Sequence, residues 1–93
     1  MTVDYEGTTN LKIGQEWSIT CSDLPENGTI SWKRNGHDLP STEFGSGILK
    51  VEVKKSERKS KLEAEEAFES HEGIYTCIDG DTNSFHLKIV YGS

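Results

Sequence analysis

Apolar and polar residues alternate along this chain in short runs, and a period of two predicts β-strands. Trp17, Ile19 and Cys21 share one parity, so they should lie on one face of a strand. Six other segments alternate in the same way. They carry Leu11 and Ile13; Ile30 and Trp32; Leu49, Val51 and Val53; Leu62 and Ala64; Tyr75 and Cys77; and Phe85, Leu87, Ile89 and Tyr91. The stretch 61–68 also contains helix-forming Glu and Ala residues, but Leu62 and Ala64 fit the two-residue period of a strand, which we predict to begin there.

Turn-forming residues separate these segments. Pro25 to Gly28 has turn chemistry, and Asn35-Gly36 is a strong hairpin signal because both residues tolerate positive φ in a type I′ turn. His37 to Gly47 has no clear period and predicts a loop with room for a short edge strand. Lys54 to Lys61 predicts a charged turn, and Asp79 to Asn83 a tight hairpin. Seven or eight short strands with regular turns predict a sandwich or a barrel.

Length and composition indicate a single small domain over residues 1–93. The chain is 32% hydrophobic and 28% charged, and its net charge is −6. This acidic balance argues against nucleic-acid binding, which needs a basic surface. We find no apolar run long enough to span a membrane and no signal peptide. We expect the chain to be an ectodomain fragment of a larger protein, so these absences leave open whether the parent has a membrane anchor.

The two cysteines form no Cys-x-x-Cys pair, which argues against zinc and leaves either one disulfide or two thiols. Asn27-Gly28-Thr29 is an acceptor sequence for N-glycosylation, which takes place in the secretory pathway. A disulfide and a glycosylated Asn27 would both fit an extracellular setting.

The spacing of four residues distinguishes a sandwich from a barrel. Cys21 lies eleven residues before Trp32, and Tyr75 lies two residues before Cys77 in the run that begins at Gly73. With these residues the chain resembles the immunoglobulin superfamily over nearly its whole length. The resemblance implies an all-β, immunoglobulin-like Greek-key sandwich of two antiparallel sheets. It also implies an inter-sheet disulfide between Cys21 and Cys77, Trp32 packed beside it, and a Tyr75 hydroxyl bonded to backbone upstream.

The chain also departs from the usual pattern of this superfamily. His71 stands where an Asp is usual, and no basic partner for that Asp is evident near Ile48, so we expect that ion pair to be absent. The chain lacks the Gly-x-Gly bulge of antigen-receptor variable domains, which favours the intermediate or C2 set. Ser31 to Leu39 and Ser70 to Tyr75 resemble segments of immune-receptor signalling chains and cell-adhesion proteins. These resemblances imply a cell-surface receptor or adhesion component.

The resemblance also implies an interaction surface. In this superfamily the usual one is the outward face of the sheet that contains the third, sixth and seventh strands of the fold. By parity we place there Lys33, Ile74, Thr76, Ile78, His86, Lys88 and Val90, and we add Asp79 and Asp81 from the adjoining turn. Three apolar residues on this face would form a modest patch of the kind that marks an interface. The alternative is incidental exposure of apolar residues, which is common.

We expect no catalysis, no metal and no cofactor. His37, His71 and His86 fall in loops or at outward positions, so we expect them to be exposed and without a chemical role. The glutamates from Glu63 to Glu72 predict a solvated acidic edge, without the Asp-x-Asp loop of a calcium site. The basic turn from Lys54 to Lys61 predicts either a solvated hairpin end or a contact for an acidic partner.

The function predicted from these features is extracellular recognition of another protein, which could itself be an immunoglobulin-like domain. The alternative is a structural immunoglobulin module of a cytoplasmic muscle-filament protein, in which the same cysteines stay reduced.

Overall fold

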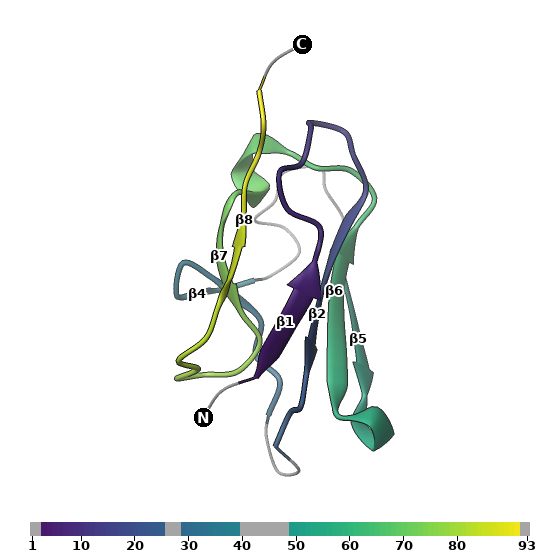
Figure 1. The fold of residues 1–93 in the computed structure, drawn as a ribbon, viewed down its shortest axis with the longest axis vertical. Coiled ribbons are helices and arrows are strands. Elements are labelled where there is room, and N and C mark those ends of the chain that lie inside the picture. Colours follow the sequence, from purple (N-terminus) through teal and green to yellow (C-terminus); the bar gives the residue numbers. More distant parts are fainter. Residues whose placement is uncertain (1–2, 26–28, 40–48, 92–93) are drawn as a thin grey trace.

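The computed structural model describes residues 3–25, 29–39 and 49–91, which form two four-stranded antiparallel sheets packed face to face (Figure 1). The strand order is β1-β2-β6-β5 in the first sheet and β4-β3-β7-β8 in the second. The strands are β1 (Asp4–Gly7), β2 (Trp17–Ser22), β3 (Lys33–Arg34), β4 (His37–Asp38), β5 (Leu49–Lys54), β6 (Lys59–Ala64), β7 (Gly73–Thr76) and β8 (Phe85–Leu87). The chain changes sheet after β2, β4 and β6, so the fold is the predicted sandwich and not a barrel.

The alternation predicted for the centre of the first sheet is confirmed. Along β2, Trp17, Ile19 and Cys21 are buried and the residues between them are half-buried. Ile19 lies opposite Leu62 of β6, which is also buried. The segment that contains helix-forming residues is a strand as far as Ala64, where β6 ends, because the side chains of Leu62 and Ala64 alternate toward the second sheet.

The first strand lies outside the predicted position. We expected it at Leu11 and Ile13, but β1 covers Asp4–Gly7 and pairs with β2. Its side chains are mostly exposed, so it has no apolar alternation to reveal it. Leu11 is buried and forms a parallel bridge with Ile89 at the second sheet, whereas Ile13 is 53% exposed.

The predicted hairpins are present. Asn35 and Gly36 join β3 to β4, with φ of 53° and 81° as a type I′ turn requires. The charged turn is shorter than predicted, because Lys54 ends β5 and Lys59–Lys61 belong to β6. It consists of the short 3-10 helix η2 (Lys55–Glu57) and Arg58, which has a left-handed φ of 54°. His37–Asp38 form β4 at the edge of its sheet, which is the short edge strand that the predicted loop allowed for. Positions 40–47 of that loop, like Asn27, lie outside the described residues.

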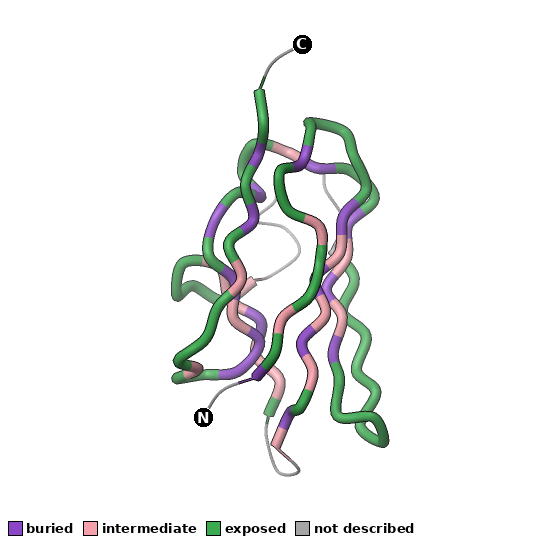
Figure 2. Tube along the Cα trace, viewed as in Figure 1, coloured by how far each residue is buried: buried purple, intermediate pink, exposed green. Residues whose placement is uncertain are grey.

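The core lies between the sheets, and β5 contributes little to it. Buried residues run along β2, β6 and β7, whereas β5 and the hairpin that follows it are exposed (Figure 2). Val51 and Val53 were expected to alternate toward one face of a strand, and they do share a face, yet they remain 53% and 43% exposed. The shared face follows from the period of a strand, and the high exposure of both valines follows from the position of β5 at the edge of its sheet.

The last predicted strand is regular only over β8, from Phe85 to Leu87. Its burial pattern continues further, because Leu87 and Ile89 are buried and His86, Lys88 and Val90 are exposed. Beyond β8 the backbone bonds instead to the N-terminal segment, where the Val90 N–H donates to the Leu11 carbonyl over 2.6 Å.

Candidate functional site

A disulfide between Cys21 of β2 and Cys77, directly after β7, joins the two sheets, as the resemblance implied. Trp32 is buried, and its indole N–H donates to the Ser60 hydroxyl of β6 over 3.0 Å. That hydroxyl donates in turn to the Glu52 carbonyl of β5 over 2.9 Å. The indole is thereby hydrogen-bonded across the sandwich, and both cysteines serve the scaffold.

Tyr75 fixes the turn before β7 as predicted. Its buried hydroxyl donates to the His71 carbonyl over 2.6 Å, and burial raises the pKa of Tyr75. Gly73 begins the strand with a φ of +156°, and a Cβ there would lie 2.8 Å from Cγ of Arg34. Glycine is therefore required where β3 and β7 come close.

His71 contradicts the prediction that it is exposed. It is fully buried in the 3-10 helix η3 (Glu69–His71). Its Nδ1 accepts hydrogen bonds from the indole N–H of Trp17 and the backbone N–H of Phe68, each over 3.1 Å. Burial lowers the pKa of His71 to about 4, and the positive charge of Arg34 lowers it further in the same direction. Tertiary packing turns this turn residue inward, so His71 belongs to the scaffold.

The outward face of the second sheet carries most of the predicted site. We call it the β3–β7–β8 face, and its residues are Lys33, Ile74, Thr76, His86, Lys88 and Val90. Ile74 lies directly opposite His86, and Lys33 directly opposite Thr76. Ile74 is 47% and Val90 43% exposed, so two of the three expected apolar residues do face solvent.

Ile78 was predicted on this face, and that prediction is wrong. It is 5% exposed and belongs to the core. β7 ends at Thr76, and the chain bends through Cys77 and Ile78, which are both buried. The parity of a strand does not continue through a bend, so the side chain of Ile78 turns inward.

The two aspartates of the β7–β8 turn have different surroundings. Asp79 is exposed and pairs with Lys33 over 2.5 Å, and this hydrogen bond raises the pKa of Lys33. Asp81 is half-buried and accepts hydrogen bonds from the Tyr5 hydroxyl and, over 3.1 Å, from the Asn83 N–H. Asp81 therefore holds its own turn against β1, whereas Asp79 lies at the border of the β3–β7–β8 face.

Tyr5 was missed by sequence reasoning. Its hydroxyl accepts a hydrogen bond from the Cys77 N–H over 3.0 Å while it donates to Asp81. Burial, and then the hydrogen bond to Asp81, raise the pKa of Tyr5. No alternation marks β1 in the sequence, so nothing there indicated that Tyr5 would reach the second sheet.

The basic turn is partly neutralised by neighbouring acids. Lys54 pairs with Glu52 and Glu57 over 3.6 and 4.0 Å, and Lys61 pairs with Glu63 over 3.4 Å. An open groove of about 220 Å³ lies over these strands. Its lining residues are Thr20, Glu52, Lys54, Glu57, Lys59, Ser60 and Lys61. The mixture of charges gives the groove no single preference for an anion or a cation.

Within the described part of the chain, no three His, Cys, Asp or Glu side chains gather as metal ligands would. His37 and His86 are exposed, on β4 and β8. None of the described helices is long and apolar enough to cross a membrane.

Comparisons with known proteins bear on the fold. No protein-family model and no curated protein sequence matches the chain. Among solved structures, the chain is similar to the first immunoglobulin domain of the mouse polymeric immunoglobulin receptor. The TM-score is 0.65 and the sequence identity 16%, over 100% of both chains. Together with the two antiparallel sheets and the disulfide from Cys21 to Cys77, this similarity shows that the chain has an immunoglobulin-like fold.

Proposed function

We propose that this domain is an extracellular recognition module that binds another protein through the β3–β7–β8 face and catalyses no reaction. The observation that carries the proposal is the exposure of Ile74. This residue is 47% exposed although β7 lies between β3 and β8 inside the sheet. An exposed apolar side chain at the centre of a sheet face offers a partner a central contact, which supports an interface there.

The rest of the face supports a protein partner. Polar groups from Lys33, Thr76, His86 and Lys88 surround the exposed apolar side chains of Ile74 and Val90. Protein interfaces commonly combine an apolar centre with a polar rim. Directly beneath the face, the Tyr75 bond and the disulfide at Cys77 hold β7, so binding would not have to order a mobile strand.

Two features support an extracellular setting. The disulfide between Cys21 and Cys77 fits an oxidising compartment, and the acceptor sequence at Asn27 fits passage through the secretory pathway. The similar solved domain comes from a receptor, which agrees with this proposal by analogy. The partner would then be a cell-surface or secreted protein, including another immunoglobulin-like domain.

The binding proposal is tested by presenting the 93-residue domain to an array of purified cell-surface ectodomains. Each binder is measured again with Ile74→Asp and with the matched control Ile13→Asp, which changes an isoleucine of similar exposure in a turn outside the β3–β7–β8 face. We expect Ile74→Asp to weaken binding at least about tenfold, since a charge would replace a central apolar contact, and Ile13→Asp to have little effect. Equal affinities for the two variants would refute the face, and an array without any binder would contradict the recognition function.

Mass spectrometry of native material distinguishes the extracellular proposal from the alternative, a structural module of a cytoplasmic muscle-filament protein. Two free thiols together with an unoccupied Asn27 would contradict the extracellular proposal.

An enzymatic function would require turnover that survives purification and falls when His37 or His86 is replaced. We expect no such turnover, because both residues lie exposed on the surface of a sheet.

A further inference from the structure

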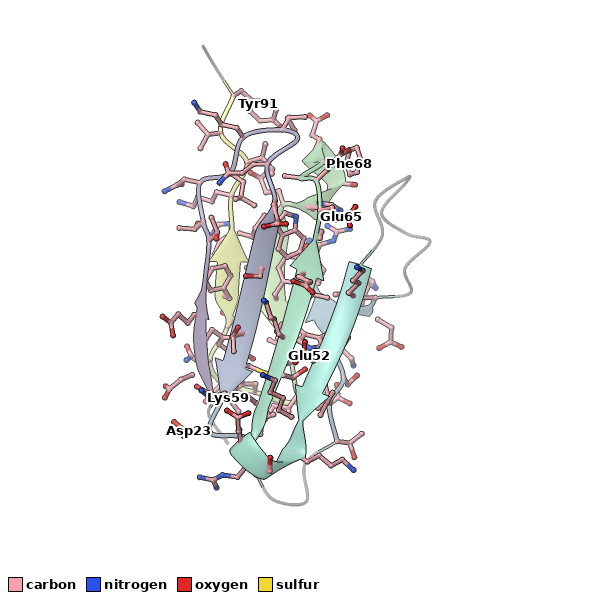
Figure 3. The ribbon with its side chains drawn as sticks, turned by 90° about the vertical axis from the view of Figure 1, so that its right-hand side faces the viewer. Asp23, Glu52, Lys59, Glu65, Phe68 and Tyr91 are labelled. Atoms are coloured by element: carbon pink, nitrogen blue, oxygen red, sulfur yellow. A yellow bond between two sulfur atoms is a disulfide. The ribbon has the colours of Figure 1, made fainter. Side chains whose placement is uncertain are left out.

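β5 offers an unoccupied edge of the first sheet. It pairs with β6 on one side, and no other described strand pairs with it on the other. Figure 3 shows β5 along the right-hand edge of this sheet. The ladder with β6 is continuous from Leu49 to Lys54, so β5 has no bulge that would disturb a second pairing. An edge strand of this kind presents backbone N–H and C=O groups to which another strand can bond.

The side chains of β5 differ between its two faces. Val51 and Val53 lie opposite Leu62 and Ser60, which are buried, so both valines have the parity of the inner face. They are nevertheless about half exposed. The outer face carries charges of alternating sign at Lys50, Glu52 and Lys54.

We propose that β5 pairs antiparallel with β5 of a second copy of this chain, about a two-fold axis at Val51. The two first sheets would then join into one continuous sheet. The proposal concerns the sheet opposite the β3–β7–β8 face and does not depend on the proposed function.

Charge selects the register. A two-fold axis perpendicular to the sheet keeps inner residues opposite inner residues. Such an axis must pass between the two copies of one residue, because an axis midway between two successive residues would place inner residues opposite outer ones. An axis at Val51 places Lys50 opposite Glu52 of the second copy, and the symmetry repeats this pair with the two copies exchanged. An axis at Glu52 would place that residue opposite itself and Lys50 opposite Lys54, and like charges in directly opposed positions are destabilising.

An axis at Val53 would also pair opposite charges, but its ladder is shorter. β5 ends at Lys54 and the chain enters η2 at Lys55, so only positions 52–54 could pair. An axis at Val51 pairs positions 49–53. The longer ladder forms more backbone hydrogen bonds and therefore favours Val51.

The neighbouring strands extend this charge pattern. Within one copy, Glu63 of β6 lies opposite Lys50, and Lys61 lies opposite Glu52. The row across the new pair would then be Glu63, Lys50, Glu52 of the second copy and Lys61 of the second copy. The four charges alternate in sign. Among the ion pairs of the described residues none includes Lys50, so its ammonium group can bond across the pair.

The association should be weak and concentration-dependent. A ladder of five residues buries much less than the roughly 1,200 Å² at which stable protein interfaces begin. The domain would be monomeric when dilute and would pair when concentrated.

Cross-linking tests the register. With the axis at Val51, a Val51→Cys variant brings two thiols into directly opposed positions, with Cβ atoms about 5 Å apart, near the distance that a disulfide requires. Val53→Cys is the matched control, because it changes the same residue type on the same face of the same strand. Its two thiols would lie four residues apart along the strands, about 13 Å, too far for a disulfide.

At high protein concentration in a mild redox buffer, we expect a covalent dimer from Val51→Cys and roughly tenfold less from Val53→Cys, because only the first pair is within bonding distance. Mass spectrometry verifies that the bond from Cys21 to Cys77 stays intact. Equal dimer from both variants, an excess from Val53→Cys, or no dimer from Val51→Cys would overturn the proposal.

A charge exchange tests the contact without cysteine. Lys50→Glu and Glu52→Lys each place like charges opposite one another, so each should weaken self-association measured by sedimentation equilibrium. The double variant restores opposite charges and should restore association. Lys88→Glu, on the β3–β7–β8 face, is the control and should change nothing. Association that resists both single changes, or that the double variant fails to recover, contradicts the pairing.

Discussion

The indole N–H of Trp17 donates a hydrogen bond to Nδ1 of His71 over 3.1 Å inside the domain. The Phe68 backbone N–H donates to the same nitrogen over 3.1 Å. A ring nitrogen can accept these bonds only while it carries no proton. The fold therefore requires neutral His71, and the same turn supplies the carbonyl that receives the Tyr75 hydroxyl.

This arrangement predicts a loss of stability in mild acid. The pKa of His71 is lowered from 6.5 to about 4 in the folded domain, so the unfolded chain takes up the proton first as the pH falls. The stabilisation is complete above pH 6.5 and is lost as the pH falls toward 4. We expect the free energy of unfolding to decrease by about 2 kcal/mol between pH 7 and pH 5 from this residue.

Urea unfolding of wild type and His71→Gln at a series of pH values measures this effect. The variant should lose that part of the pH dependence, whereas His37→Gln, at an exposed histidine, should keep it. Parallel pH curves for wild type and His71→Gln would show that His71 does not control acid stability.

The Tyr75 hydroxyl should matter more than a comparable surface hydroxyl. Tyr75→Phe leaves the buried His71 carbonyl without this donor and should cost about 1–3 kcal/mol of unfolding free energy. Tyr91→Phe removes an exposed hydroxyl bonded to Glu69 over 3.0 Å and should stay within about 0.5 kcal/mol. Denaturant midpoints measure both, and equal losses would contradict the structural role of Tyr75.

The same substitution should destabilise the domain far more at Ile78 than at Ile74. Ile78→Asp puts a carboxylate into the core and should destabilise the domain by more than about 3 kcal/mol. Ile74→Asp changes an exposed side chain and should cost about 0.5 kcal/mol or less. Thermal unfolding of the two variants compares them directly. A stable Ile78→Asp variant would show that Ile78 faces solvent.

Tyr5 and Asp81 should be energetically coupled. The Tyr5 hydroxyl connects the Asp81 carboxylate with the Cys77 N–H, so the two side chains form one network. A double-mutant cycle of Tyr5→Phe and Asp81→Asn should give a coupling of about 0.5–3 kcal/mol. Additive losses would mean that the two side chains stabilise the domain independently.

Much of the scaffold was predictable because its signals are local or have fixed spacing. The alternation at Trp17, Ile19 and Cys21 identified a central strand, and Asn35-Gly36 identified a hairpin from backbone preferences alone. Most of the candidate face followed from parity, since Ile74 belongs to a regular strand. Parity failed at Ile78 because β7 ends before it.

Residues whose partners are distant in sequence could not be predicted in this way. The sequence by itself determined the strand periods, the turns and the spacing of Cys21, Trp32 and Cys77, because these depend on neighbouring residues and on a repeating geometry. Only the tertiary structure decided that His71 is buried against Trp17, 54 residues away, and that Tyr5 reaches Asp81. Such contacts depend on how two sheets pack, and no period along the chain encodes that packing.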